Sequence, residues 1–472
     1  MPAFCNSFLA APTRREMLRT SANGFGMLAL GSLLAQRSNA AEAPRSALAP
    51  KAPHFAPKAK RIIFLFMHGG PSQVDTFDPK PMLKKHDGKP YPGSKPRVQF
   101  ASTGNLLQSP WAFKPGGESG IQVSDLFPHV RERADDLCVI RSVHADNSAH
   151  GGALLQLHTG SDTFIRPSMG SWLTYGLGTE NQNLPGFVTI CPSYGHGGVQ
   201  NWSSAFLPAE YQGTPIGQSG KRVKDSKVAD IAGTGPANLQ RMQLDLLQQM
   251  NKEHRQHTGP DTALEGRMSA FELAFRMQTE APTVMDLSKE TKDTFDLYGV
   301  GTEPTDDFGR QCLLARRFAE AGVRFVQVSH SYKWDQHGGL KKDHAKNALE
   351  VDKPIAGLLK DLKQRGLLED TLVWWGGEFG RTPTAQGGDG RDHNPHAFSM
   401  WFAGGGTKGG HVHGATDDFG YYAAENKVHM TDLHATILAL MGLDHEKLTY
   451  KHAGRDFRLT DVKGSTVREI FA

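Results

Sequence analysis

Apolar residues follow two alternating patterns along the chain, short continuous runs and longer stretches with helical spacing. Runs at 61–67 and 371–375 lead into glycine-containing loops, which is typical of strands buried on both faces of a sheet. Further runs of this kind lie at 137–140, 186–190, 323–328 and 397–402. Helical spacing of apolar residues covers 308–321, 352–365 and 431–441. This alternation predicts an α/β fold, a mostly parallel sheet with helices on both faces.

Residues 195–300 depart from this alternation. They are largely polar, and helical spacing is confined to 239–254 and 263–278. We therefore expect one large domain over residues 61–472, in which 195–300 form an inserted helical segment or lid.

The first 60 residues have a different character. Arg14 and Arg15 form a twin-arginine motif, an apolar stretch follows at 25–35, and the small residues 38–40 resemble a cleavage site. We expect residues 1–40 to be a signal peptide for the twin-arginine route, which would make the mature protein periplasmic or secreted. Residues 41–60 are rich in Ala, Pro and Lys and are expected to be a linker. No later apolar run reaches the roughly 18 residues that a membrane span requires.

Charge and cysteine content exclude several classes of function. The formal net charge is +4, and most of the excess comes from residues 1–40, so the mature chain has no nucleic-acid footprint. The four cysteines form no CxxC pair, which argues against a zinc ribbon or a disulfide scaffold. The glycine run at 404–406 lacks the spacing of a dinucleotide fingerprint.

Polar side chains gather where the predicted strands end. Because the carboxyl ends of parallel strands meet at one edge of a sheet, these side chains are expected to lie close together. Most of these side chains follow the strands at 61–67, 137–140, 323–328 and 371–375, and two of them precede the strand at 397–402. In chain order they are His68, Ser148, His150, Asp335, His337, Glu378, Arg381, Asp392 and His393.

Imidazole and carboxylate groups are suitable ligands for several divalent metals. We predict a metal site built on Asp335, His337 and His393. Glu378 and Asp392 would be further ligands or would orient the ligating imidazoles. The metal would be zinc, manganese, iron or calcium, and the residue types leave its identity open.

These residues stand in motifs that resemble a known family. The motifs are His68-Gly-Gly-Pro-Ser-Gln-Val-Asp-Thr-Phe-Asp78, the segment from His150 to Thr159-Gly160, Arg166-Pro-Ser-Met-Gly170, Trp334-Asp-Gln-His337, Gly377-Glu-Phe-Gly-Arg-Thr382, Gly390-Arg-Asp-His-Asn-Pro395 and Gly414-Ala-Thr-Asp417. The chain resembles domain-of-unknown-function family 1501, of the alkaline phosphatase and sulfatase superfamily. The resemblance implies an alkaline-phosphatase-like fold and one or two divalent metals at strand ends.

The resemblance also shows departures. The superfamily's nucleophile precedes a helix that ends in Thr-Gly, and this position falls on His150, with Ser148 two residues earlier. No C/S-x-P-x-R motif stands there, so the formylglycine mechanism of sulfatases is not expected. Asp335, His337 and His393 match the metal ligands best. His68 stands where the superfamily has a metal-binding aspartate, and Glu378 also replaces an aspartate, which implies a second metal site that is weakened or rebuilt.

The resulting hypothesis is an exported, metal-dependent hydrolase of phosphate or sulfate esters, with a small molecule or a polysaccharide as substrate. Arg381 would clamp the oxyanion. The nucleophile would be water, Ser148 or His150, and His150 would serve equally well as a general acid. The alternative is a catalytically inactive superfamily member that binds a polysaccharide or an exported partner protein. Convergence of His150, His337 and His393 would favour the first hypothesis, and a His150 that points into packed interior would favour the second.

Overall fold

The computed structural model describes residues 47–94, 104–226, 231, 235–259 and 261–472. The signal peptide expected over 1–40 and the first part of the expected linker lie outside these residues. The later part of that linker is held against the domain. Leu48 and Ala59 are buried there, and backbone hydrogen bonds join Lys51 N to Leu177 O (2.9 Å) and Lys58 N to Leu440 O (2.8 Å).

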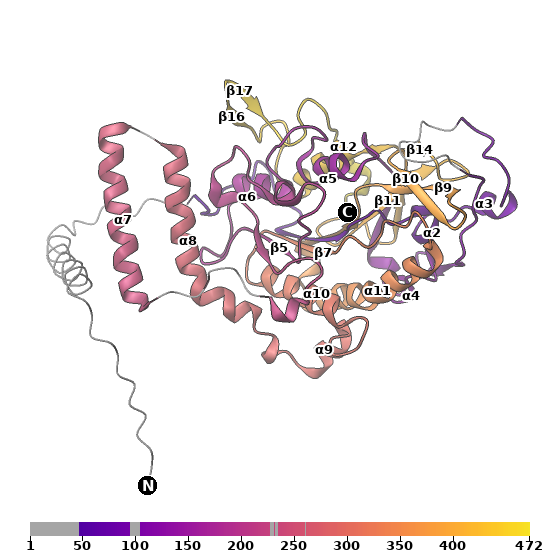
Figure 1. Ribbon diagram of the computed structural model, residues 1–472, viewed down its shortest axis with the longest axis horizontal. Helices are drawn as coiled ribbons and strands as arrows, with labels where there is room; N and C mark the ends of the chain where they lie inside the picture. The colour runs from indigo at the N-terminus through magenta and orange to yellow at the C-terminus, as the bar shows by residue number, and fades with distance from the viewer. Residues whose placement is uncertain (1–46, 95–103, 227–230, 232–234, 260) are drawn as a thin grey trace, which may run out of the picture. The chain divides into compact units, whose positions relative to one another are not determined.

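A nine-stranded sheet forms the centre of the fold, and it confirms the predicted α/β class with a mostly parallel sheet (Figure 1). Its order is β12-β4-β11-β8-β1-β7-β5-β6, with β15 beside β4. The strands are β1 (Arg61–Met67), β4 (Leu137–His144), β5 (Phe187–Ile190), β6 (Thr214–Ile216), β7 (Phe325–His330), β8 (Thr371–Gly376), β11 (Phe398–Ala403), β12 (His411–His413) and β15 (Val428–His429). All six predicted runs are strands of this sheet.

β1 lies at the middle of the sheet, parallel to both neighbours, with Ile63 opposite Val326 of β7 and Val373 of β8. β11 runs antiparallel between β8 and β4. Two reversals in succession restore the direction, so β4 points the same way as β1 and β8. The carboxyl ends of β1, β4, β5, β7 and β8 therefore lie at one edge of the sheet.

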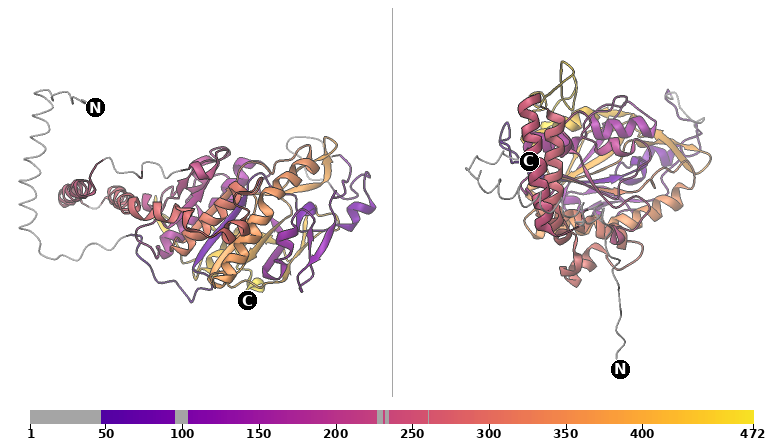
Figure 2. Two further views of the ribbon diagram at one scale, coloured as in Figure 1. Left: turned by 90° about the horizontal axis from the view of Figure 1, so that it is seen from below. Right: turned by 60° about the vertical axis from the view of Figure 1, so that its left-hand side comes forward.

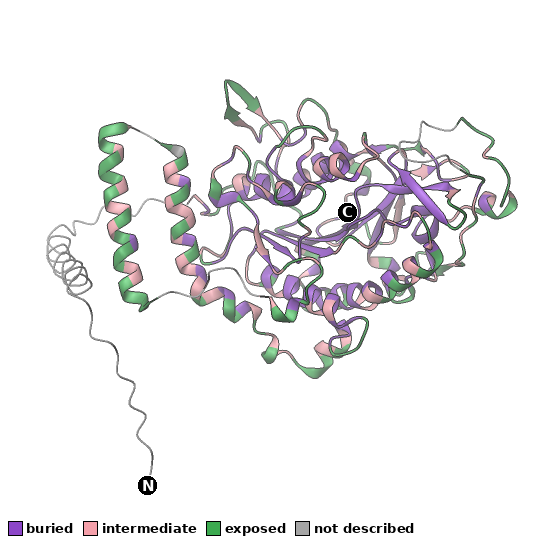
Figure 3. Cartoon of the chain, in the orientation of Figure 1, coloured by how far each residue is buried: buried purple, intermediate pink, exposed green. Residues whose placement is uncertain are grey.

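Helices cover both faces of the sheet (Figure 1). On one side lie α4 (Pro128–Arg131), α10 (Asp306–Glu320) and α11 (Leu340–Gln364). On the other side lie α5 (His150–Thr159), α6 (Met169–Leu177) and α12 (Met430–Leu440). Strands β1, β5, β7, β8 and β11 are buried along their whole length (Figure 3). The rings of Phe64 and Trp374, on neighbouring strands, stack at 3.7 Å within this core.

Shorter helices and two-stranded sheets lie outside the central sheet. The helices are α2 (Gln73–Thr76), α3 (Pro81–Lys85) and α9 (Lys292–Tyr298). The paired strands are β2 (Phe113–Gly116) with β3 (Ile121–Ser124), β9 (Gly380–Gln386) with β10 (Gly390–Asn394), β13 (Ala415–Thr416) with β14 (Ala423–Glu425), and β16 (Tyr450–His452) with β17 (Arg455–Phe457). Single 3₁₀ turns lie at 134–136, 198–202, 209–211, 223–225, 287–289, 368–370 and 468–470.

The polar region 195–300 contains a long helical hairpin, α7 (Ala237–Thr258) and α8 (Thr262–Met285). Figures 1 and 2 show it extending away from the sheet. Arg241 of α7 donates to Glu272 of α8 at 2.9 Å, and Gln248 donates to the same carboxylate at 2.9 Å. Among the described residues, no helix has both the length and the apolar character needed to cross a membrane.

Candidate metal centre

The predicted site residues meet at the carboxyl edge of the sheet. β7 leads into the loop that carries Asp335 and His337, and β8 leads into Glu378. The β9–β10 hairpin follows directly and brings in Arg381 and His393. Helix α5, after β4, contributes His150 as its first residue. Parallel strands therefore place residues more than 240 positions apart in sequence within hydrogen-bonding distance.

Asp335 is the hub of the cluster. Its Oδ1 atom lies 2.9 Å from Nε2 of His337, 3.0 Å from Nε2 of His393 and 3.3 Å from Nε2 of His150. The Nε2 atoms of His337 and His393 are themselves 3.0 Å apart. Three imidazole nitrogens thus surround one carboxylate oxygen.

The opposite nitrogen of each ring has an acceptor as its partner. His337 Nδ1 lies 2.5 Å from Gln386 Oε1, and His393 Nδ1 lies 2.7 Å from the carbonyl oxygen of Ser148. His150 Nδ1 lies 2.7 Å from Glu378 Oε1. Because none of these oxygens can donate, each Nδ1 carries the proton, and a neutral ring then presents the lone pair of Nε2 to Asp335. Three nitrogen lone pairs that face the Asp335 carboxylate repel its negative charge. The arrangement is stable only if a bound cation, or protonation of the rings, places positive charge between them.

The donor set fits a divalent metal. In a tetrahedral site with bonds of about 2.0 Å, the ligand atoms are separated by about 3.3 Å, and the distances from Asp335 Oδ1 to the three Nε2 atoms, 2.9 to 3.3 Å, are close to this value. Two ligand groups fit a metal among the described residues, His150 with Asp335 and His393, and His337 with Asp392 and His393. Acceptors behind each ligating histidine are the usual arrangement around a bound metal.

The pKa values of the carboxyl and imidazole groups in the cluster are shifted by their charged neighbours. Burial raises the pKa of Glu378, but the hydrogen bond from His150 and the nearby His68 outweigh it and lower the value to about 2. Burial likewise opposes ionisation of Asp335, yet hydrogen bonds from His150, His337 and His393 bring its pKa well below the usual range. His337 has a raised pKa because its protonated ring would donate from Nε2 to Asp335. Protons and a metal ion would therefore compete for this cluster.

Arg381 was expected to clamp an oxyanion, and the structure places its side chain inside the protein. Its side chain is fully buried, and Nη2 donates to Asp335 Oδ1 at 2.7 Å and to the carbonyl oxygens of Gly69 and Trp334. Nε donates to Gly70 O at 3.0 Å, and Nη1 donates to Arg391 O at 3.2 Å. All three nitrogens are thus engaged inside the protein, and one of them holds the carboxylate of Asp335.

Other predicted residues lie behind the cluster. Glu378 is fully buried and accepts from Gly69 N through both oxygens, at 3.0 and 3.2 Å. Asp392 Oδ1 accepts from the backbone of His393 at 2.8 Å and lies 3.8 Å from His337 Nδ1. Ser148 contributes its carbonyl oxygen to His393. From these positions, the three residues can orient the imidazole rings of the cluster.

His68 lies at the end of β1 but belongs to neither metal-ligand group of the described residues. Its ring neighbours are Phe66, Tyr332, His196 and His150, with centroids 5.3, 4.8, 5.9 and 6.4 Å away. Burial lowers the pKa of His68 to about 4, so the ring is neutral near pH 7.

Three neighbours of the cluster were missed in the sequence analysis. Gln386 orients His337, the Tyr332 hydroxyl donates to Asp335, and His196 stacks on His150 with ring centroids 5.0 Å apart. Phe379 stacks on His393 at 4.3 Å. The β9–β10 ladder has a bulge beside His393, which only the register of the two strands reveals.

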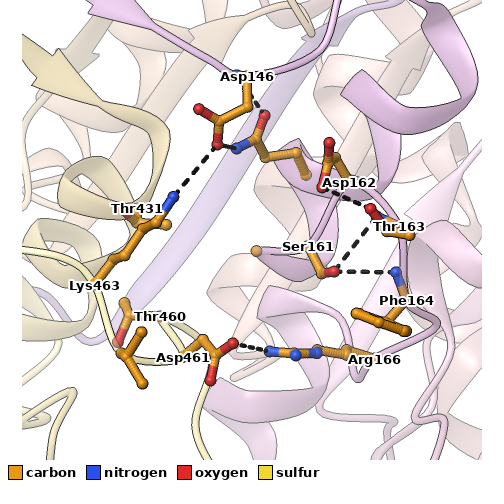
Figure 4. Close-up of a pocket in the computed structure, with 13 residues that line it drawn as sticks. Asp146, Ser161, Asp162, Thr163, Phe164, Arg166, Thr431, Thr460, Asp461 and Lys463 are labelled. Carbon is orange, nitrogen blue, oxygen red and sulfur yellow. Dashed lines mark hydrogen bonds and ion pairs between the residues drawn. The ribbon is translucent and has the colours of Figure 1, made fainter.

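A separate polar hollow of about 200 Å³ is lined by Asp146, Arg166, Asp461 and Lys463 among others (Figure 4). It contains two ion pairs, Arg166 with Asp461 at 3.1 Å and Lys463 with Asp146 at 3.9 Å. None of the predicted site residues lines it. Of these two sites, only the Asp335 cluster has a group of side chains that fits a metal ion.

Comparison with known proteins adds a family match. The family model described as "Protein of unknown function (DUF1501)" matches residues 59–471. The chain also resembles solved structures at 10–12% sequence identity. They are Ps i-CgsB (12% identity, 82% of this chain, 72% of that chain, TM-score 0.39), the lipoteichoic acid synthase LtaP from Listeria monocytogenes (10%, 88%, 78%, 0.36) and a protein in the alkaline phosphatase superfamily from Vibrio parahaemolyticus (10%, 86%, 72%, 0.37). No curated protein matches the sequence.

Proposed function

The chain belongs to the DUF1501 family of proteins of unknown function, and we propose that it is a metal-dependent hydrolase of phosphate or sulfate esters that acts after export. The ester would be carried by a small molecule or a polysaccharide. The proposal excludes a formylglycine nucleophile, because His150 stands at the start of α5, where the superfamily places its nucleophile.

One observation carries the proposal. Three Nε2 lone pairs, from His150, His337 and His393, converge on Asp335 Oδ1 within 3.3 Å. Although His150 is buried, its ring is aimed at this focus and not at apolar side chains of the core. By the criterion set from the sequence, this arrangement favours metal-dependent chemistry over the inactive alternative.

The roles of the residues follow from their partners. Asp335, His337, His393 and His150 would hold the metal, which would act as a Lewis acid on an ester oxygen and lower the pKa of water. Gln386, the carbonyl of Ser148 and Glu378 each fix one imidazole with Nε2 toward the centre. Arg381 holds the carboxylate of Asp335 in place.

This assignment also narrows the role of His150. Its Nδ1 proton is committed to Glu378, and Nε2 lies 3.3 Å from Asp335 Oδ1, in one ligand group with Asp335 and His393. A nitrogen in that position serves as a ligand, so we assign the attack on the ester to water and not to His150.

The direct test is hydrolysis of 4-nitrophenyl phosphate and 4-nitrophenyl sulfate by protein purified with its metal. We expect the wild type to cleave one of them, and His337→Ala to lose more than about 100-fold in kcat/KM, because a metal ligand is removed. His257→Ala is the matched control, since His257 is exposed and lies on α7, which carries none of the residues of the cluster.

Equal activity in His337→Ala and wild type would contradict the proposal. Cleavage of neither ester by protein that retains its metal would favour the binding role instead.

A further inference from the structure

Because Arg381 is engaged inside the protein, an ester substrate needs other donors for its non-bridging oxygens. This inference rests on the proposed function and concerns the same site. The candidate donors must lie beside the metal-ligand cluster, carry N–H or O–H groups and have no partner within the protein.

His68 meets these conditions. It is 1% exposed, and neither Nδ1 nor Nε2 has a hydrogen-bond partner among the described residues. A neutral imidazole always keeps one N–H, and a buried donor without a partner is rare in native proteins. The missing partner is an acceptor that none of the described residues provides.

The surroundings of His68 show where such an acceptor would lie. Phe66 stacks on the ring at 5.3 Å, and Tyr332 and His196 lie on its other sides at 4.8 and 5.9 Å. The Tyr332 hydroxyl donates to Asp335, and His196 stacks on His150. His68 therefore borders the metal-ligand cluster through both of these neighbours.

His196 reaches this place from the loop after β5. It is exposed, and its backbone is left-handed at φ 48°, a conformation that a non-glycine residue adopts at a cost. Asn201 Nδ2 donates to its carbonyl oxygen at 3.3 Å. The loop thus holds an imidazole over the cluster with one side open to solvent.

We propose that His68 and His196 form the oxyanion-binding side of the active site. Each would donate one N–H to a non-bridging oxygen of the phosphate or sulfate group. The nearest carboxylates, Glu378 and Asp335, are both hydrogen-bonded to imidazoles, so their charge is already partly balanced. His68 supplies the inner donor and His196 the outer one.

Binding of inorganic phosphate and inorganic sulfate to the metal-containing protein tests this inference by calorimetry, without any turnover. We expect His68→Phe, which keeps the ring but loses both nitrogens, to weaken binding of the preferred anion roughly ten-fold or more. His196→Ala should have a similar effect, and because His196 is exposed, its removal leaves the core intact. His68→Gln, which restores a donor, should recover part of the loss.

Metal content is measured on every variant, and His257→Ala is the control. Unchanged anion affinity in His68→Phe and His196→Ala would overturn the inference. Loss of metal from His68→Phe would also overturn it, because His68 would then be a ligand. If neither ester is cleaved but anions bind through His68 and His196, the proposed hydrolysis fails while this assignment stands.

Discussion

At the scale of single residues, the centre depends on which nitrogen of each histidine holds the proton. His150, His337 and His393 all direct Nε2 to Asp335 because an acceptor occupies the other side of each ring. The metal affinity of the cluster should therefore depend on residues that never touch the metal. Gln386 is the clearest of these, since it is the partner of His337 and was not predicted from the sequence.

Gln386→Ala should lower metal affinity about 10- to 100-fold, because His337 loses the contact that fixes its tautomer and orientation. Competition with a chromophoric chelator measures the affinity. Gln243→Ala, an exposed glutamine on α7, is the matched control. An affinity in Gln386→Ala equal to that of the control would show that His337 needs no such partner.

The buried ion pair between Asp75 and Arg391 has a structural role behind the site. Both side chains are fully buried, with Arg391 Nε 2.7 Å from Asp75 Oδ2. Asp75→Ala should lower the free energy of unfolding by about 3–5 kcal/mol, because it leaves the Arg391 charge buried without its partner. Urea denaturation measures this, with Asp245→Ala, an exposed i,i+4 partner of Arg241, expected to cost at most about 1 kcal/mol. Similar losses in the two variants would refute the burial argument.

At the scale of elements, the close approach of two loops positions Asp335. Gly69, after β1, has φ +117°, and a Cβ there would lie 2.7 Å from the backbone nitrogens of Trp334 and Asp335. Trp334 N also donates to the carbonyl oxygen of His68 at 3.1 Å. The end of β1 and the loop after β7 therefore form one rigid unit, and this unit is possible only with glycine at 69.

Gly69→Ala should displace the loop at 334–335 and reduce metal content, although no ligand is replaced. Gly88→Ala is the matched control, because Gly88 is also left-handed at φ +71° but a Cβ there meets nothing within 4 Å. The control should lose about 1 kcal/mol of stability from backbone strain alone and keep its metal. Full metal content in Gly69→Ala would contradict the proposed coupling of the two loops.

Helix α11 is tied to the loop after β7 through Glu350. Its Oε2 atom lies 3.0 Å from His330 Nε2, and Lys333 Nζ also contacts it. Burial opposes ionisation of Glu350, but the hydrogen bonds from His330 and Lys333 outweigh it and lower its pKa to about 2. A carboxyl with a depressed pKa in the folded state stabilises the fold above its unfolded pKa of about 4.3, and this stabilisation is lost as the pH falls toward 2.

Glu350→Gln should therefore remove about 2 kcal/mol of stability at neutral pH, after allowance for solvent screening, and little at pH 2. Denaturant unfolding at several pH values measures the difference between variant and wild type. A difference that stays constant from pH 7 to pH 2 would show that the charge of Glu350 contributes nothing.

At the scale of the whole molecule, the sheet was predictable and its helices less so. Continuous apolar runs reveal strands buried on both faces, and all six predicted runs became strands. Helix α11 begins twelve residues before the predicted 352, because its first half buries polar residues such as His344 and Asn347. A pattern read from apolar residues alone misses such a segment.

The site was predictable to the extent that strand ends define it. The prediction that Asp335, His337 and His393 lie together follows from the parallel strands. The burial of Arg381 and the positions of Gln386, Tyr332 and His196 depend on how loops fold over one another. No periodicity in the sequence encodes those contacts.

The central claim is that the cluster around Asp335 holds a metal ion. Metal content of the natively purified protein, measured by inductively coupled plasma mass spectrometry, tests it most directly, with Asp335→Ala/His337→Ala and the control His257→Ala alongside. Our account predicts close to one divalent metal ion per chain in the wild type and the control, and its loss from the double variant. A folded wild-type protein without metal, or a double variant that retains it, would contradict the account.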